Sequence, residues 1–112
     1  MKAIHRDDGE LCGYVAASDG SWHALAVFGG VLGAADTGEA AERIVREIGL
    51  PALAERWLLR TDESGDEQVV CIQEASPDGV TVALDYYSMP GVPTRRISRD
   101  ELDTGRCTLR RS

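Results

Sequence analysis

The sequence predicts an α+β protein in which a three-stranded antiparallel meander and one helix precede a second set of short antiparallel strands. Two patterns support this class: one amphipathic helix with start and stop signals between residues 36 and 51, and short apolar segments separated by turn-forming glycines. A chain of 112 residues has room for one domain or two very small ones. We therefore expect a β3α unit at residues 1–51 and a small β module at residues 52–112, sharing one core.

The first three strands are predicted to be separated by two tight turns. Residues 10–17 and 22–28 flank Ser18-Asp19-Gly20-Ser21, in which Asp-Gly is a strong signal for a two-residue hairpin. Gly29-Gly30 predicts a second two-residue turn, leading into a strand at residues 31–35.

These two turns fix which residues share a face of the sheet. Gly13, Ala26 and Gly33 form a row of small residues across three strands, where a helix can pack closely. The opposite face is almost uncharged and holds Cys12, Tyr14, Leu25, Val27 and Leu32. An apolar face of this kind needs cover. We expect that cover from the second half of the chain in a monomer, or from a second copy in a homodimer.

Residues 36–51 predict the helix. Asp36 and Glu39 have the spacing of a capping box, and Thr37 is the alternative cap one residue later. The apolar positions recur at helical spacing and form the side expected to pack on the small-residue row: Ala40, Ala41, Ile44, Val45 and Ile48. Gly49 predicts a left-handed residue after the helix, and Pro51 prevents its continuation.

With these turns and caps, residues 10–49 resemble the β3α units of AP2-type domains and integrase arm-binding domains. The likeness rests on Gly20-Ser21-Trp22, Leu32-Gly33, Asp36-Thr37 and Glu39-Ala40-Ala41. It implies three strands followed by a helix, and in that family the sheet face away from the helix reads DNA with basic and aromatic residues. The corresponding positions here are those of the uncharged face, which has no Arg or Lys, so no functional residue is carried over.

Five further strands are predicted after Pro51, at residues 55–61, 67–75, 80–86, 94–97 and 106–109. The segment 53–61 also has helix-forming residues, and we interpret residues 55–61 as a strand. Ser76-Pro77-Asp78-Gly79 predicts a tight turn and residues 88–93 a loop. Ser98 and Glu101 have the spacing of a capping box for a single helical turn before the last strand. This order of elements makes residues 55–112 resemble an SH3-like antiparallel barrel or sheet.

Composition and charge limit the possible functions. Hydrophobic residues make up 43% of the chain and charged residues 28%, as in ordinary globular proteins. The net charge of −7 disfavours nonspecific binding to nucleic acid or to an anionic membrane. No apolar run approaches the length of a membrane-spanning helix, and the first ten residues lack an apolar signal segment. We therefore expect a cytoplasmic protein without membrane contact.

The cysteines and histidines predict neither a disulfide framework nor a metal site. Cys12, Cys71 and Cys107 are odd in number, widely spaced and outside any CxxC pattern. His5 and His23 are far apart, with no acidic residue at ligand spacing. We expect no cofactor and interpret the cysteines as small hydrophobic residues of strands.

The strongest candidates for a binding site follow the predicted strand 80–86. Two adjacent tyrosines at its end, Tyr86 and Tyr87, place one ring in the core and one outside, beside a loop that contains proline. SH3-like barrels commonly bind partners with aromatic residues in such loops. The possible partner-binding residues are Tyr87, Met89, Arg95 and Arg96; we predict no catalytic, cofactor-binding or metal-binding residue.

The sequence therefore favours a small non-enzymatic protein that acts as a protein-interaction or accessory module. Two alternatives remain open. One is nucleic-acid binding through the C-terminal arginines, which are Arg95, Arg96, Arg99, Arg106, Arg110 and Arg111. The other is an acidic inhibitor or immunity-type protein that blocks a basic partner with the acidic residues of segment 62–85.

Overall fold

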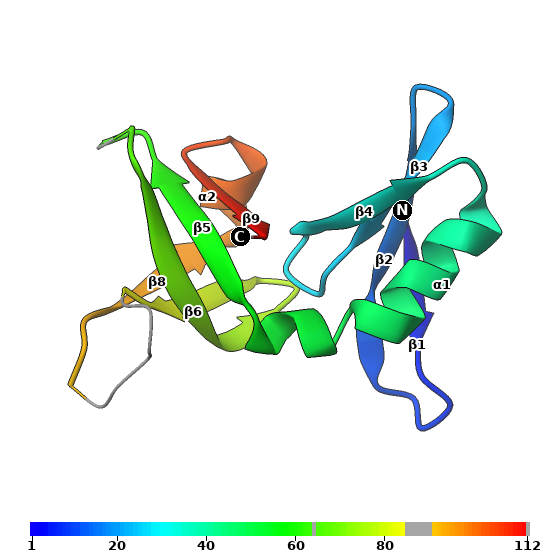
Figure 1. Cartoon of the computed structure of the whole chain (residues 1–112), viewed down its shortest axis with the longest axis horizontal. Helices are drawn as coiled ribbons and strands as arrows, with labels where there is room; N and C mark the ends of the chain where they lie inside the picture. The colour runs from blue at the N-terminus through cyan, green and yellow to red at the C-terminus, as the bar shows by residue number, and fades with distance from the viewer. Residues whose placement is uncertain (64, 85–90, 112) are drawn as a thin grey trace. The chain divides into compact units, whose positions relative to one another are not determined.

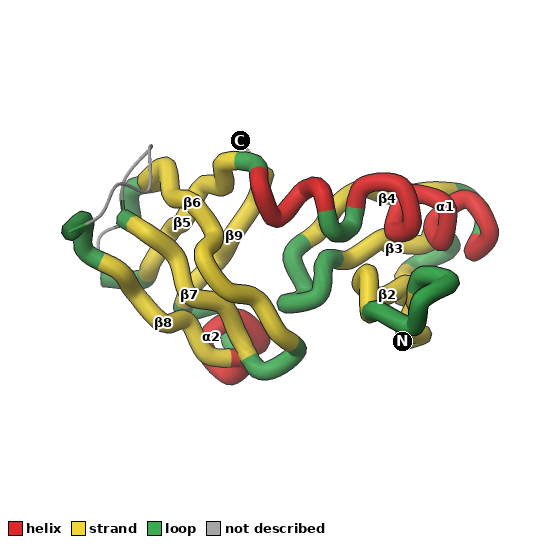
Figure 2. Tube along the Cα trace, turned by 90° about the horizontal axis from the view of Figure 1, so that it is seen from below, coloured by secondary structure: helices red, strands yellow, loops and turns green. Residues whose placement is uncertain are grey.

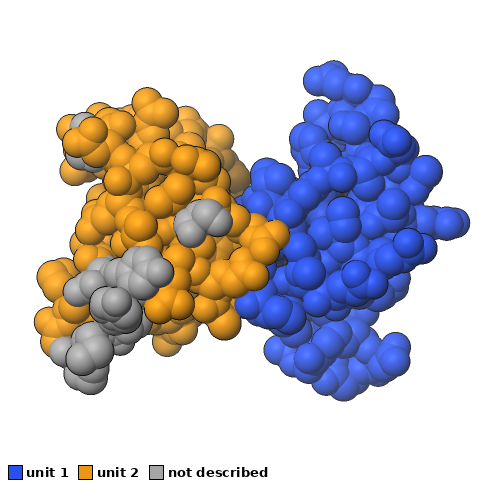
Figure 3. All heavy atoms as spheres, viewed as in Figure 1, with its two compact units in different colours: residues 1–53 blue, residues 54–112 orange. Residues whose placement is uncertain are grey.

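The computed structural model describes residues 1–63, 65–84 and 91–111. The chain forms two compact units, Met1–Leu53 (unit 1) and Ala54–Ser112 (unit 2), each built on its own antiparallel sheet (Figures 1 and 3). The predicted α+β class is confirmed, whereas the shared core stays a prediction. No helix in the described part of the chain is long and apolar enough to cross a membrane.

Unit 1 contains a four-stranded sheet and one helix. Its strands are, in spatial order, β1 (Lys2–His5), β2 (Leu11–Ser18), β3 (Ser21–Leu25) and β4 (Val31–Ala35). The prediction of three strands was wrong, because all four residues of β1 pair with β2. Ile4 is the one buried residue of β1, at 1% exposure, so this strand has too short an alternating pattern to be recognised from the sequence.

The β2–β3 hairpin is confirmed. Ser18 pairs with Ser21 across a two-residue turn, in which Asp19 and Gly20 have φ values of 47° and 83°. Positive φ at both central positions is the requirement of the tight hairpin turn that Asp-Gly favours. The turn chemistry of the sequence therefore determines this register.

The connection from β3 to β4 differs from the prediction. Leu25 pairs with Val31, and the amide of Ala26 donates to the carbonyl of Gly30 at 2.8 Å, so residues 26–30 form the loop instead of Gly29-Gly30 alone. As a result Gly33 lies opposite Ala24 instead of Ala26. Because side chains alternate with a period of two, this shift by two residues keeps Gly33 on its predicted side. A bulge between Ala24 and Leu25 changes the pairing by one further residue, and Ala26 and Val27, which were predicted on the strand, lie in the loop.

Helix α1 (Gly38–Ile48) packs on the predicted face of this sheet (Figure 2). A Cβ atom on Gly13 would lie 3.1 Å from Val45, and one on Gly33 would lie 3.6 Å from Ile44. The expectation that the apolar side of the helix lies over Gly13 and Gly33 is therefore confirmed. Small residues at these two positions let the helix backbone approach the sheet.

The two ends of α1 correct the predicted caps. Thr37, the alternative, is the N-cap, and its hydroxyl accepts a hydrogen bond from the amide of Ala40 at 3.1 Å. Gly49 is right-handed, with φ of −56°, so the predicted left-handed conformation is wrong. Glycine is needed there for space, because a Cβ atom would collide with the carbonyl oxygen of Cys12.

Unit 2 contains a five-stranded sheet with the spatial order β8-β7-β6-β5-β9 (Figure 2). Its first strand follows a short 3₁₀ helix, η1, which resolves the ambiguous segment 53–61 into a turn and a strand. The five predicted strands and the helical turn are confirmed, with ends that differ by a few residues. The elements are η1 (Pro51–Ala54), β5 (Arg56–Thr61), β6 (Glu67–Ser76), β7 (Gly79–Ala83), β8 (Thr94–Ser98), α2 (Arg99–Asp103) and β9 (Cys107–Arg111).

Four neighbouring strands supply the large side chains that are fully buried in unit 2: Trp57, Val70, Val80, Val82 and Ile97. Ser98 caps α2, and the reciprocal hydrogen bonds between Ser98 and Glu101 confirm the predicted capping box. The predicted strand at residues 80–86 ends at Ala83. Tyr86 and the loop residues 88–90 lie outside the described residues.

Candidate protein-binding surface

Strand β8 places two of the predicted binding residues on opposite faces of its sheet. Arg95 and Arg96 are adjacent, and the side chains of a strand alternate in direction. Arg95 is half-buried, whereas Arg96 is exposed. The structure therefore does not bring the two guanidinium groups together. The other two predicted residues, Tyr87 and Met89, lie outside the described residues.

Arg95 lines a hollow of about 350 Å³, together with residues that include Leu59 and Leu84. Its guanidinium lies 3.2 Å from the carboxylate of Glu101 and 3.5 Å from the sulfur of Cys107. Burial lowers the pKa of Arg95, but the hydrogen bond to Glu101 and the charges around it raise this pKa by more. Arg95 is thus a permanent positive charge that internal contacts hold in place.

Glu101 and Cys107 complete this internal cluster. The pKa of Glu101 is lowered first by the hydrogen bond from the Ser98 amide, at 3.1 Å, and next by the one from Arg95. Burial raises the pKa of the Cys107 thiol above its ordinary value of 9.0, although Arg95 acts in the opposite direction. A thiol that is 1% exposed and protonated is a poor nucleophile. The cluster therefore connects β8, α2 and β9 and is unsuited to covalent catalysis.

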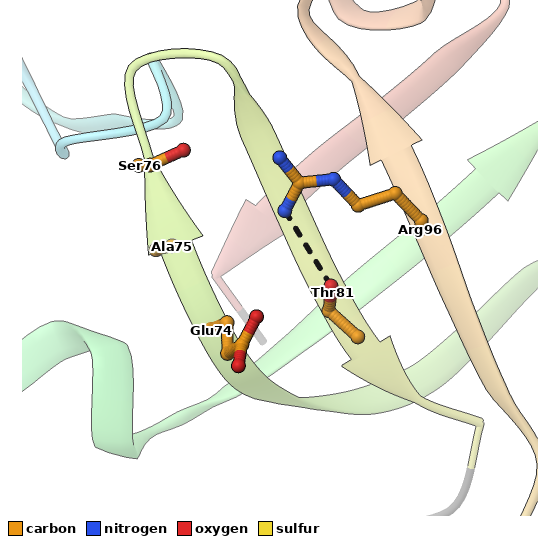
Figure 4. Close-up of a pocket in the computed structure, with 5 residues that line it drawn as sticks. All are labelled: Glu74, Ala75, Ser76, Thr81 and Arg96. Carbon is orange, nitrogen blue, oxygen red and sulfur yellow. Dashed lines mark hydrogen bonds between the residues drawn. The ribbon is translucent and has the colours of Figure 1, made fainter.

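Arg96 belongs to an exposed row of side chains that crosses β6, β7 and β8. Thr81 pairs with Glu74 on one side and with Arg96 on the other; we call these three residues the Arg96 row. With Ala75 and Ser76 they line an open hollow of about 510 Å³. Figure 4 shows the guanidinium of Arg96 above Thr81, whose hydroxyl accepts its hydrogen bond at 3.5 Å.

Glu74 was not singled out from the sequence, although its place in this row follows from a tight turn. Ser76 pairs with Gly79 across a two-residue turn, and Glu74 pairs with Thr81 two residues further along each strand, in unbroken register. The β-bulge around Gln73 shifts only the pairs beyond Glu74. The predicted turn at residues 76–79 was therefore the signal that could have placed Glu74 opposite Thr81.

The other C-terminal arginines are neutralised by carboxylates of the same unit. Their ion pairs are Arg95–Glu101, Arg99–Asp103, Arg106–Asp100, Arg110–Glu67 and Arg111–Glu55. The pair between Arg110 and Glu67 is bidentate, with distances of 2.6 and 2.8 Å. Arg96 differs from these five, because within the described residues its partner is the neutral hydroxyl of Thr81.

The remaining candidate groups are dispersed. Over residues 1–63, 65–84 and 91–111, no three His, Cys, Asp or Glu side chains form a group that could hold a metal ion. The three cysteines are free thiols. In the acidic segment 62–85, the exposed residues Asp62, Glu63 and Asp66 lie at the connection between β5 and β6, while Glu67 is paired with Arg110.

No family model matches the chain, and neither a curated protein nor a solved structure matches it. Its function is therefore inferred from the contacts, burial and charge of its own residues.

Proposed function

We propose that the chain is a small, non-enzymatic cytoplasmic module that binds a partner protein through the Arg96 row. Unit 2 serves as an SH3-like scaffold for this surface. The order of its elements supports that likeness, as does the pairing of the last strand, β9, with the first strand, β5. Three free thiols suit a reducing compartment such as the cytoplasm.

The observation that carries the proposal is that Arg96 has no ion pair among the described residues. Each of the other five C-terminal arginines is paired with a carboxylate. The hydrogen bond from Arg96 to Thr81 is long, at 3.5 Å, and therefore weak. A guanidinium has five N–H donors in a planar arrangement that matches a carboxylate. Arg96 can thus give most of its hydrogen bonds to an acidic group of a partner.

The opposite end of the row offers the opposite charge. Glu74 is exposed and, in the part of the chain that the structure describes, forms no ion pair. Thr81 lies between the two charges, and Ala75 and Ser76 line the hollow beside it. All three side chains are small, so a partner side chain can reach the sheet surface. A partner that carries both charges would be held in one orientation, because complementary charges contribute mainly to specificity.

The internal cluster supports a structural role over an enzymatic one. Burial raises the pKa of Cys107, which disfavours a thiolate nucleophile at neutral pH. Hydrogen bonds from Ser98 and Arg95 lower the pKa of Glu101, which disfavours a general acid there.

Nucleic-acid binding has less support. Ion pairs within unit 2 offset most of the C-terminal positive charge, and the chain carries a net charge of −7. Phosphate binding by these arginines would first require their internal carboxylate partners to be displaced.

A second candidate is a basic partner bound at the acidic connection between β5 and β6. Glu63 and Asp66 are exposed and line the hollow that Arg95 also lines. This arrangement suits an acidic inhibitor or immunity-type protein. Lysine substitutions of Glu63 and Asp66 would abolish such binding, whereas binding at the Arg96 row would persist.

Site-specific photo-crosslinking in the native host tests the proposal. A photoreactive amino acid replaces Asp78, which is exposed at the turn beside the Arg96 row, or, as the control, Thr108, which is exposed on β9. We expect a covalent adduct with another polypeptide from the Asp78 position and none from Thr108. Equal adducts from both positions, or none from Asp78, would contradict a binding surface at the row.

A further inference from the structure

The Arg96 row carries opposite charges at its two ends. It runs from a carboxylate on Glu74, through the neutral hydroxyl of Thr81, to a guanidinium on Arg96. Neighbouring strands lie about 4.8 Å apart, so the two charged positions are separated by roughly two strand spacings. No ion pair joins Glu74 to Arg96, and the dashed contact in Figure 4 links Arg96 to Thr81 instead.

Such a row is complementary to itself. A two-fold axis parallel to the sheet and to its strands, passing above Thr81, places the Arg96 position of one copy opposite the Glu74 position of the other, and the reverse contact follows by symmetry. Thr81 lies between the two charges, and Ala75 and Ser76 also line the hollow of about 510 Å³, so the guanidinium of a facing copy has space to enter it. Each copy would fill the hollow of the other with the same side chain.

We propose that a second copy of the chain docks on the Arg96 row, forming a two-fold dimer held by two reciprocal ion pairs between Arg96 and Glu74. This inference rests on the proposed function, because it names the occupant of the same surface. The arginine gives up its long hydrogen bond to Thr81 and gains a charged acceptor, and charge-assisted hydrogen bonds are the stronger kind. The dimer is weak and depends on concentration, because ion pairs with access to solvent contribute little each.

Charge reversal tests the pairing directly. Glu74→Arg places like charges opposite each other at both contacts of the dimer, and so does Arg96→Glu. Each variant alone should be a monomer in sedimentation velocity experiments at concentrations where the unchanged chain is a dimer, with association weakened at least about tenfold. An equimolar mixture of the two variants should form a dimer again, because arginine then faces glutamate at both contacts.

The mixture also serves as the folding control, since unfolded variants would not rescue each other. Arg110→Glu is the matched charge change on β9, and it should leave the dimer unchanged. A chain that is monomeric at every concentration would overturn the inference. A dimer that persists in both charge-reversed variants would overturn the inference as well. If that dimer were lost in Leu25→Asp, the dimer contact would be assigned to the sheet of unit 1.

These outcomes separate the inference from the proposed function. If the chain is monomeric but the photoreactive residue at position 78 still captures a different polypeptide, the self-docking inference fails and the binding function stands. If position 78 captures nothing and the chain is monomeric, both fail. An adduct of twice the chain mass, together with rescue in the mixture, supports both.

Discussion

The guanidinium of Arg95 on β8 lies 3.2 Å from the carboxylate of Glu101 on α2, and the same guanidinium reaches the sulfur of Cys107 on β9. Strands β8 and β9 are the two edges of the unit 2 sheet. Side chains of this cluster therefore connect the edges that backbone hydrogen bonds leave apart. The contribution of this cluster to the stability of the folded chain depends on the negative charge of Glu101, so that contribution depends on pH.

Glu101→Gln should lower the melting temperature at neutral pH. The difference in melting temperature between the variant and the unchanged chain should disappear in acid. The folded chain lowers the pKa of Glu101 from its ordinary value of 4.5, so its stabilising contribution is present above that value and lost as the pH falls through the folded pKa. Glutamine can keep the capping-box hydrogen bonds through its amide oxygen, whereas its NH2 group cannot accept from Arg95, so the variant removes the charge together with that hydrogen bond. Thermal melts of both proteins between neutral and acidic pH measure the difference, and a gap that stays constant below pH 4.5 would refute this account.

Gly49→Ala should destabilise unit 1 by roughly 1–3 kcal/mol, because its Cβ atom would collide with the carbonyl oxygen of Cys12. Gly38→Ala is the matched control at the other end of α1. Its Cβ atom would lie 3.6 Å from the ring of Trp22, an ordinary contact, so it should be neutral or stabilising by up to about 1 kcal/mol. Urea titration measures the free energy of unfolding of both variants. If the two substitutions had equal effects, the close approach of Gly49 to Cys12 would not be the reason for glycine at position 49.

The packing of α1 on its sheet predicts a graded series at Gly33. Gly33→Ala should be tolerated, because the new Cβ atom would lie 3.6 Å from Ile44, whereas Gly33→Val should overpack the contact and cost roughly 1–3 kcal/mol. Gly13→Ala should be worse than Gly33→Ala, because its Cβ atom would collide with the carbonyl oxygen of Leu25. Chemical denaturation measures these effects. If Gly33→Val cost no more than Gly33→Ala, the helix would not lie over Gly33.

Nucleic acid should bind more weakly than about 10⁻⁴ M at physiological salt, the weak end of nonspecific affinities. The reason is that five of the six C-terminal arginines are already paired with carboxylates. Fluorescence anisotropy with labelled duplex DNA and single-stranded RNA measures the affinity. Tight binding that falls steeply as salt rises would contradict the ion-paired arrangement.

Local signals predicted most elements of the fold. The Asp19-Gly20 turn, the capping box of Ser98 with Glu101 and the helical spacing of Ile44 and Val45 each act over a few residues, so the sequence shows them directly. The missed strand β1 depends on pairing with β2, a contact between distant residues that no local pattern encodes.

The binding surface was harder to predict than the fold. Arg96 was recognised as a candidate, and its separation from Arg95 follows from strand alternation. Among the described residues, the other five C-terminal arginines are ion-paired and Arg96 is not, and this difference depends on where the carboxylates lie in the folded unit. It therefore requires the structure. Glu74 lies opposite Thr81 in continuous register from the turn at residues 76–79, so its place could have been inferred from the predicted turn.

The proposal that Arg96 binds a partner protein is tested most directly by quantitative capture from extracts of the native host. The bait is the unchanged chain, Arg96→Gln or the matched control Arg110→Gln, which removes the same charge from a residue already paired with Glu67. The account predicts that proteins enriched by the unchanged chain are also enriched by Arg110→Gln and are lost with Arg96→Gln. Equal enrichment by all three baits would contradict a binding role for Arg96.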